Sequence, residues 1–228
     1  MSLADERPTL RSHRIGVGLY DLDEDGRLTR RHRVELDVTG ERTEVSELVG
    51  QRAPDLLLIN DDDLTFAKLR FDERSLATLV DNGVASLTEP LPRALAWTTV
   101  TDMLRDAELP ARDYVELVLD GVGQESEMTV VQTLLGRARS AVDLYADPDA
   151  HIALAARWAS GLHVLVLAAG AGSDHQLALV RAWAAAAGSP EHVAEVAGLL
   201  SGEHSRPGLE VDTDLRWHLL QCLVAMGH

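Results

Sequence analysis

The chain has 228 residues, of which 46% are apolar, enough for one large domain or two of ordinary size. Its formal net charge of −16 repels phosphate backbones and anionic lipids, so we expect no nucleic acid and no membrane partner. Because Cys222 is the single cysteine and the longest apolar stretch, residues 162–171, is too short to span a bilayer, we expect a soluble, cytoplasmic protein.

The first 72 residues carry the patterns of β-strands. After a polar lead-in of ten residues, apolar and polar residues alternate over residues 13–20 and again over residues 33–38. Residues 56–59 form a continuous apolar run, which predicts a third strand. Residues 40–50 fit either another edge strand or a connection.

Residues 66–71 alternate again, with Phe66 on one face and Phe71 on the other, and predict a half-buried strand. Residues 60–63, Asn-Asp-Asp-Asp, favour the turn of a hairpin before it, and an interface or ion-binding role is the alternative. Four or five short strands at this spacing predict a small antiparallel β-sandwich in residues 1–72.

The turn between the first two strands resembles part of a calcium-binding loop. Asp21, Asp23, Asp25 and Gly26 match the D-x-D-x-D-G pattern of an EF-hand. The twelfth position, where such a loop needs a bidentate glutamate, is His32, and the flanks alternate as strands. We therefore predict a hairpin turn and keep weak calcium binding as a minor hypothesis.

From Asp72, a predicted N-cap followed by Glu73, the period becomes helical. Small residues, among them Ala156 and Ala159, would let helices approach closely. We therefore predict an α+β protein in which residues 73–228 form a HEAT/armadillo-like helical array, although no clean repeat is visible. The predicted helices are residues 73–81, 88–110, 111–120, 127–145, 148–167, 174–187, 190–200 and 212–226.

Three segments, in this order, resemble the M1 family of zinc aminopeptidases of the bacterial aminopeptidase N type. They are NDDDLTFAKLRFDERSLATL (residues 60–79), LPRALAWTTVTDMLRDAELPARDYVELVL (residues 91–119) and VDTDLRWHLLQCLVAMG (residues 211–227). Together they cover roughly a third of the chain. The resemblance identifies the β-sandwich and the ERAP1-like C-terminal helical domain of such an enzyme.

The resemblance implies that the whole enzyme removes N-terminal amino acids from peptides using zinc. In it, this region would cap the active-site chamber and control substrate access, with the catalytic domain of the same polypeptide and the peptide substrate as partners. The family continues beyond residue 228, so we expect a truncated helical domain with an exposed apolar edge at its last helix. The alternative is a standalone helical-repeat module that binds a protein partner.

The zinc signature of the family is missing from this sequence. An M1 enzyme binds zinc through H-E-x-x-H on a helix, and no two of the nine histidines here are four residues apart. We therefore predict no catalytic and no metal-binding residue in this chain, which would be inactive alone, with zinc a cofactor of the parent enzyme only.

Weaker candidates have simpler structural interpretations. His192 and Glu195 share a helical face as a metal pair could, but a solvated polar face is the preferred interpretation. His163 lies among apolar residues, which favours a hydrogen-bonded core histidine. Cys222 is interpreted as a buried packing residue rather than a nucleophile.

The remaining motifs do not predict a reaction. Ser173, Asp174 and His175 are adjacent in sequence, which indicates a helix N-cap rather than a catalytic triad. The glycines at positions 121 and 123 and at 170 and 172 lack the strand and helix that would cradle phosphate. Four arginines could contact a substrate carboxylate or lie on helix surfaces: Arg93, Arg105, Arg112 and Arg216.

Overall fold

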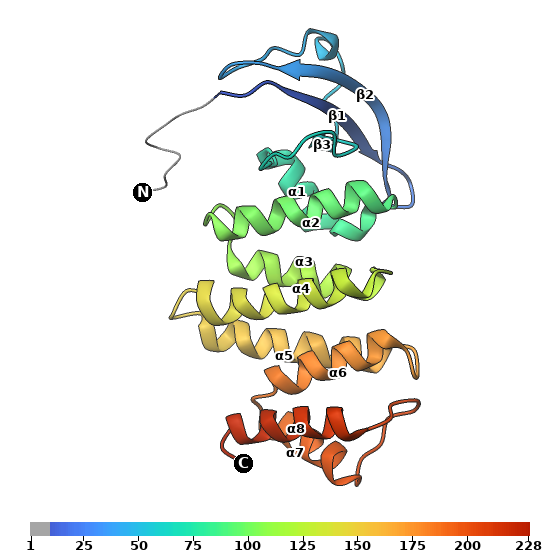
Figure 1. Ribbon diagram of the computed structural model, residues 1–228, viewed down its shortest axis with the longest axis vertical. Helices are drawn as coiled ribbons and strands as arrows, with labels where there is room; N and C mark the ends of the chain where they lie inside the picture. Colours follow the sequence, from blue (N-terminus) through green and yellow to red (C-terminus); the bar gives the residue numbers. More distant parts are fainter. Residues whose placement is uncertain (1–9) are drawn as a thin grey trace. The chain divides into compact units, whose positions relative to one another are not determined.

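The computed structural model describes residues 10–228, which form a three-stranded antiparallel sheet followed by eight α-helices (Figure 1). This α+β architecture confirms the predicted fold class. The chain divides into two compact units, Met1–Glu108 and Leu109–His228. Strands change to helices at Glu73, as the sequence indicates, but the first unit also contains two helices. A domain boundary between residues 72 and 73 therefore stays a prediction.

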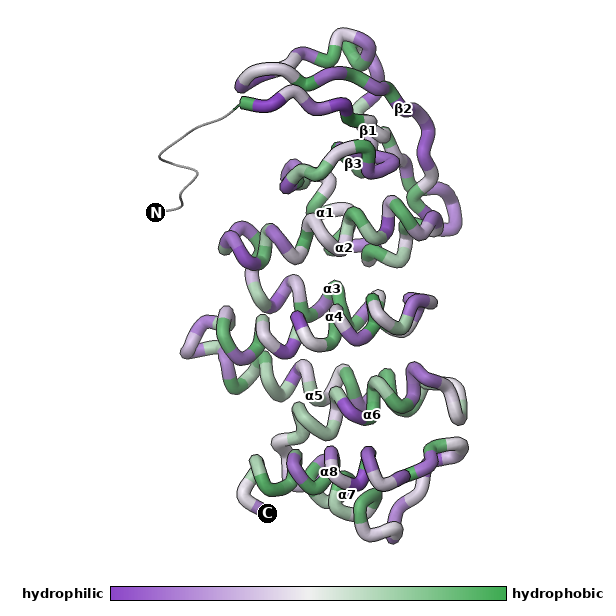
Figure 2. Tube along the Cα trace, viewed as in Figure 1, coloured by the Kyte–Doolittle hydropathy of each residue, from purple (hydrophilic) through white to green (hydrophobic). Residues whose placement is uncertain are grey.

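The sheet of the first unit has the order β2-β1-β3, with both pairs antiparallel. Its strands are β1 (His13–Leu22), β2 (Leu28–Val38) and β3 (Leu56–Ile59). The first two are longer than the alternation predicts, because their ladder continues to the Leu22–Leu28 pair beside the turn. Figure 2 shows hydrophilic residues in purple along much of β2, one of the two edge strands.

The two faces of this sheet differ. Leu56 and Leu58 of β3 point to one face and are fully buried, and α1 (Glu73–Asn82) contacts this strand. The opposite face carries a purely aliphatic cluster that includes Leu48 of a short 3₁₀ turn (Ser46–Leu48). The other members of this cluster are Ile15, Val17, Leu19, Val34, Leu36, Val38, Leu57 and Ile59.

The strand predicted at residues 66–71 is wrong, because these residues form no strand and pair with no strand of the sheet. Phe71 is buried as the alternation requires, but Phe66 is fully exposed. Lys68 and Arg70 form ion pairs with Asp106, which follows α2 (Pro90–Arg105). A segment held by its side chains can show the same alternation as a paired strand, so the pattern alone could not separate them. Residues 40–50 are a connection.

The turn between β1 and β2 is a hairpin, as predicted. Gly26 has a positive φ of 75°, and the Asp23 carboxylate accepts the backbone N–H groups of Asp25 and Arg27 at 3.0 and 2.8 Å. Asp21 is turned toward Arg31, at 2.5 Å. Calcium binding at this turn stays a hypothesis.

The second unit is helical. The pairs α3–α4, α5–α6, α6–α7 and α7–α8 are in contact, as are α3–α5, α4–α6 and α6–α8. The predicted helix at residues 127–145 is α-helical only to Ser140, because the next turn is a π-helix (Ala141–Tyr145). The helices are α3 (Ala111–Gly121), α4 (Met128–Ser140), α5 (His151–Ala168), α6 (Asp174–Ala186), α7 (Pro190–Ser201) and α8 (Thr213–Ala225).

Candidate functional site

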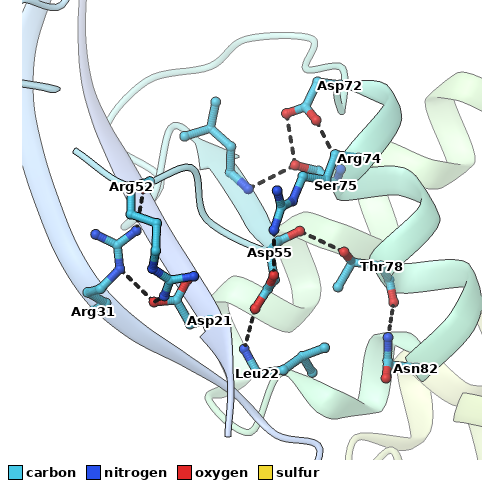
Figure 3. A network of polar contacts seen from close by, with 11 residues as sticks. Asp21, Leu22, Arg31, Arg52, Asp55, Asp72, Arg74, Ser75, Thr78 and Asn82 are labelled. Atoms are coloured by element: carbon cyan, nitrogen blue, oxygen red, sulfur yellow. Dashed lines mark hydrogen bonds and ion pairs between the residues drawn. The ribbon is translucent and has the colours of Figure 1, made fainter. Parts of the chain in front are cut away.

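A network of polar contacts joins the sheet to α1 in the first unit (Figure 3). Its centre is Asp55, just before β3, whose carboxylate accepts the backbone N–H of Leu22 at 3.0 Å and pairs with Arg74 at 2.8 Å. The Asp55 carbonyl accepts the hydroxyl of Thr78 at 2.7 Å. One residue thus ties the end of β1 to two turns of α1.

Ser75 of α1 covers the outer edge of β3. Its hydroxyl accepts the N–H of Leu57 at 2.8 Å and donates to the Asp72 carboxylate at 2.8 Å. Asp72 also accepts the N–H of Ser75 at 2.9 Å, which confirms it as the N-cap of α1. A helix side chain therefore satisfies a backbone group that an edge strand would otherwise leave unpaired.

Asp55 gives the first prediction. The Leu22 N–H and then the Arg74 guanidinium hold the pKa of Asp55 below its ordinary value. Its contribution to stability is therefore complete above an ordinary aspartate pKa of about 4 and is lost as the pH falls through the lower folded value. We expect Asp55→Asn to lower stability at pH 7 and to flatten its pH dependence below about pH 4. Urea unfolding at several pH values tests this, and an unchanged acid slope would contradict it.

A second network surrounds Asp61, whose side chain is fully buried. Its carboxylate accepts the Tyr20 hydroxyl at 2.9 Å and an Arg30 guanidinium nitrogen at 2.9 Å. Burial, followed by the charge of Asp61, raises the pKa of Tyr20, which therefore stays a neutral donor. Two glycines of β1 leave room for this loop, because a Cβ on Gly18 would lie 2.3 Å from the Asp61 carboxylate and one on Gly16 would lie 2.3 Å from its carbonyl oxygen.

The loop that carries Asp61 has an unusual backbone. Asn60, Asp62 and Asp63 have positive φ values of 58°, 73° and 52°. Non-glycine residues adopt this conformation rarely, and asparagine and aspartate tolerate it best. The Asn60 side chain accepts the N–H of Thr65 at 3.1 Å and donates to its carbonyl at 2.7 Å. The predicted turn is confirmed, but the hairpin is wrong, because no strand is formed at residues 66–71. The turn places the buried carboxylate of Asp61 at the sheet.

A third cluster lies in the second unit around Trp183 of α6, which is fully buried. His163 of α5 stacks on it at a centroid distance of 5.0 Å, and His192 of α7 meets it edge-on at 5.6 Å. His163 lies 3.0 Å from the Glu195 carboxylate, which also pairs with Arg206. His163 has the polar partner that was predicted, but it is half-buried rather than a core residue. Glu195 is not simply a solvated partner of His192.

His192 gives the second prediction. Burial and then the neighbouring His163 lower the pKa of His192, and its Nδ1 has no hydrogen-bond partner among the described residues. Above an ordinary histidine pKa of about 6.5 both folded and unfolded states are neutral, whereas below it the unfolded state takes up the proton first. Stability should therefore fall as the pH drops from about 6.5 through the folded value. We expect His192→Gln to flatten this slope, and His228→Gln, at the exposed end of the chain, to leave it unchanged in thermal unfolding from pH 7 to 5.

Comparison with known proteins gives two findings. Residues 56–228 match the family model described as the ERAP1-like C-terminal domain. The chain belongs to this family. It is also 52% identical, over 224 residues and 98% of its length, to "Aminopeptidase N" of Streptomyces lividans, of which it spans 26%. The chain therefore corresponds to about a quarter of that protein, and the resemblance found in the sequence is confirmed.

This member of the ERAP1-like C-terminal domain family has no group of three or more His, Cys, Asp or Glu side chains placed to hold a metal within residues 10–228. Ser173 is the N-cap of α6, accepting the N–H of Gln176 at 3.1 Å, as its position predicts. Cys222 is buried, and burial raises the pKa of its thiol, which opposes a nucleophilic role.

The four candidate arginines are divided between the two units, two in each. Arg112 lines a cavity of about 630 Å³ beside Arg157, which pairs with Glu116. Arg93 binds the Leu87 carbonyl at 2.8 Å, as a structural contact within the first unit. The other two are exposed on helix surfaces: Arg105 and Arg216.

Sequence reasoning missed two of these clusters. The Tyr20–Asp61 contact had a faint signal, a G-x-G pair inside a strand, which marks a place where another chain segment comes close. The contact of Arg206 with Trp183, at 5.6 Å from its ring, had none, because a loop residue and a helix residue 23 positions away show no shared period.

Proposed function

We propose that this chain is a non-catalytic C-terminal part of a zinc aminopeptidase N, an enzyme that removes N-terminal residues from peptides. The observation that carries the proposal is the 52% identity that extends over 98% of the chain, to an aminopeptidase N nearly four times longer. In that enzyme the helical unit would cap the active-site chamber and limit substrate access. Its partners would be the catalytic domain of the same polypeptide and the peptide substrate.

In this proposal, zinc is bound by a part of the enzyme that lies outside this chain. The described residues offer no donor set that fits the ion, so we assign them no step of hydrolysis. What they supply is shape and charge. The net charge of −16 would raise the local concentration of the cationic amino end of a peptide.

Two finer features of the fold belong to the same proposal. Contacts between neighbouring helices (α3–α4, α5–α6, α6–α7 and α7–α8) and between alternate ones (α3–α5, α4–α6 and α6–α8) support a HEAT-like array. The aliphatic face of the sheet supports a β-sandwich, because within the described residues only Leu48 packs on it from outside the strands. A second sheet would cover that face.

The experiment is to add this chain to a separately produced catalytic part of an aminopeptidase N. We expect no hydrolysis of an aminoacyl p-nitroanilide by the chain alone. Upon mixing, we expect tight binding and a changed ratio of kcat/KM between a dipeptide and a decapeptide, because a cap restricts access. A helical-repeat protein of equal net charge is the matched control for nonspecific electrostatic effects.

Binding without a change in that ratio would contradict the capping role. It would still support the proposal that this chain and the catalytic domain belong to one polypeptide. No binding at all would favour the alternative, a standalone helical-repeat module without an enzymatic parent. The gene sequence upstream of this segment decides between the two proposals independently. An H-E-x-x-H motif in the same reading frame supports the aminopeptidase and not the standalone module.

A further inference from the structure

Residues 66–70 of the first unit begin with an aromatic side chain that touches nothing. Phe66 is fully exposed, and Leu64, two residues before it, is 43% exposed. Single apolar residues on a protein surface are common and need no explanation by themselves. Phe66 differs from such residues because the segment that carries it lies between two fixed points.

The first fixed point is the loop before the segment. The Asn60 side chain holds both the N–H of Thr65, at 3.1 Å, and its carbonyl, at 2.7 Å. The Thr65 hydroxyl also lies 2.9 Å from Nδ1 of His13, the first residue of β1. These contacts maintain the left-handed backbone of the loop, and strained backbone of this kind concentrates at binding sites. Phe66 is therefore presented by a loop whose shape is set in advance.

The second fixed point follows the segment. Phe71 is buried, and Arg70 forms ion pairs with Asp106 and Glu108. Lys68 pairs with the same Asp106 at 2.5 Å. The two cationic side chains are thus neutralised within the first unit, so the segment meets an approaching chain with little net charge of its own.

The backbone between the two fixed points is unpaired. Residues 66–70 form no backbone–backbone hydrogen bond with any residue in the range 10–228, and the Leu69 carbonyl accepts only the Arg70 guanidinium, at 2.7 Å. Ala67, in the middle, is exposed. A run of unpaired N–H and C=O groups is what an extended peptide bonds to when it adds to an edge. The backbone therefore specifies the kind of partner, which exposed apolar side chains alone would not.

We propose that residues 66–70 bind an extended segment of the aminopeptidase polypeptide that lies outside this chain, with hydrogen bonds to their backbone and with Phe66 in an apolar pocket of the partner. This inference rests on the proposed function. The chain spans 26% of its aminopeptidase relative, so about three quarters of that polypeptide remain to supply the partner. A second copy of this chain is a poor partner, because each copy carries a net charge of −16.

Two alanine substitutions test the aromatic anchor. The remaining polypeptide of an aminopeptidase N, produced separately, should bind Phe66→Ala at least tenfold more weakly than the unchanged chain, as expected for a buried aromatic anchor. Leu91→Ala, at a 44% exposed leucine of α2, is the matched control and should change the affinity less than twofold. Both side chains are exposed, so neither substitution should unfold the chain, and circular dichroism verifies this.

Hydrogen–deuterium exchange tests the backbone contact. The amides of residues 66–70 should exchange rapidly in the chain alone, because they have no backbone partner there. In the mixture with the remaining polypeptide they should exchange at least 100-fold more slowly. Residues 40–42, an exposed connection of the same unit, should keep their exchange rate.

The outcomes separate this inference from the proposed function. Binding that Phe66→Ala leaves unchanged, or binding without protection of residues 66–70, would overturn the inference and leave the peptidase role standing. Protection in the concentrated chain alone would assign the segment to a second copy, and protection by an added decapeptide would assign it to the substrate. Either result would also overturn the inference, whereas no binding at all would contradict both proposals.

Discussion

Asp61→Asn is expected to lower the free energy of unfolding of the first unit by about 2–4 kcal/mol. The substitution keeps the shape of the side chain but removes the charge that faces Arg30, 2.9 Å away in a fully buried position. It also replaces an acceptor of the Tyr20 hydroxyl with an amide that can present the wrong atom. Arg30 keeps a second partner, Asp62, at 3.0 Å, so the loss comes from the buried position of Asp61 itself, where its contacts are worth more than those of a surface pair.

Asp63→Asn is the matched control, because Asp63 is exposed in the same loop and makes one side-chain contact, at 3.2 Å, with Asn60. We expect it to cost less than 1 kcal/mol. Hydrogen–deuterium exchange of peptides from β1 and β3 localises the effect, and urea unfolding measures its size. Equal effects of the two substitutions would show that the buried ion pair does not stabilise the sheet.

The elements that the sequence predicted well are those whose signal is local. β3 at residues 56–59 is an unbroken apolar run with a turn after it, and α6, α7 and α8 begin one residue after a serine or aspartate whose side chain accepts a backbone N–H. Strand or helix period and capping are both properties of a few neighbouring residues. Their boundaries consequently agreed within one residue.

Residues 66–71 show where local information ends. Alternation reports that one face of an extended segment is buried, and says nothing about whether a neighbouring strand is available to bond its backbone. Here Phe71 is buried while Lys68 and Arg70 reach Asp106, so ion pairs hold the segment where a ladder was expected. The partner that decides the outcome lies more than 30 positions away in the sequence.

The candidate sites also separate into those with a local signal in the sequence and those that depend on distant residues. The absence of a histidine pair at helical spacing was visible in the sequence, and so was Asp72 as a cap. The cluster of Trp183, His163 and His192 was not, because it is assembled from three helices whose relative rotation depends on packing throughout the second unit. Periodicity placed each residue on a helix but not opposite its partners.

Gly208→Ala is expected to cost more than 3 kcal/mol and to be the most disruptive single-methyl change in the second unit. Gly208 has a φ of 74°, and a Cβ there would lie 2.2 Å from the backbone nitrogen of Gly172. Two backbone segments cross at this point, and Gln176 holds them together by accepting the N–H of Gly172 at 2.9 Å and donating to the Pro207 carbonyl at 3.0 Å. Neither segment can move aside without breaking these bonds.

Gly202→Ala separates the two causes of strain. Gly202 closes α7 with a left-handed φ of 86°, and a Cβ there would meet nothing within 4 Å. It should therefore cost only the backbone penalty, about 1 kcal/mol. Since both substitutions add one methyl group at a positive φ, the difference between them in urea unfolding measures the backbone clash alone. Similar losses would mean that the loop around Gly208 moves away from Gly172 at little cost, and that the crossing does not fix the connection between α7 and α8.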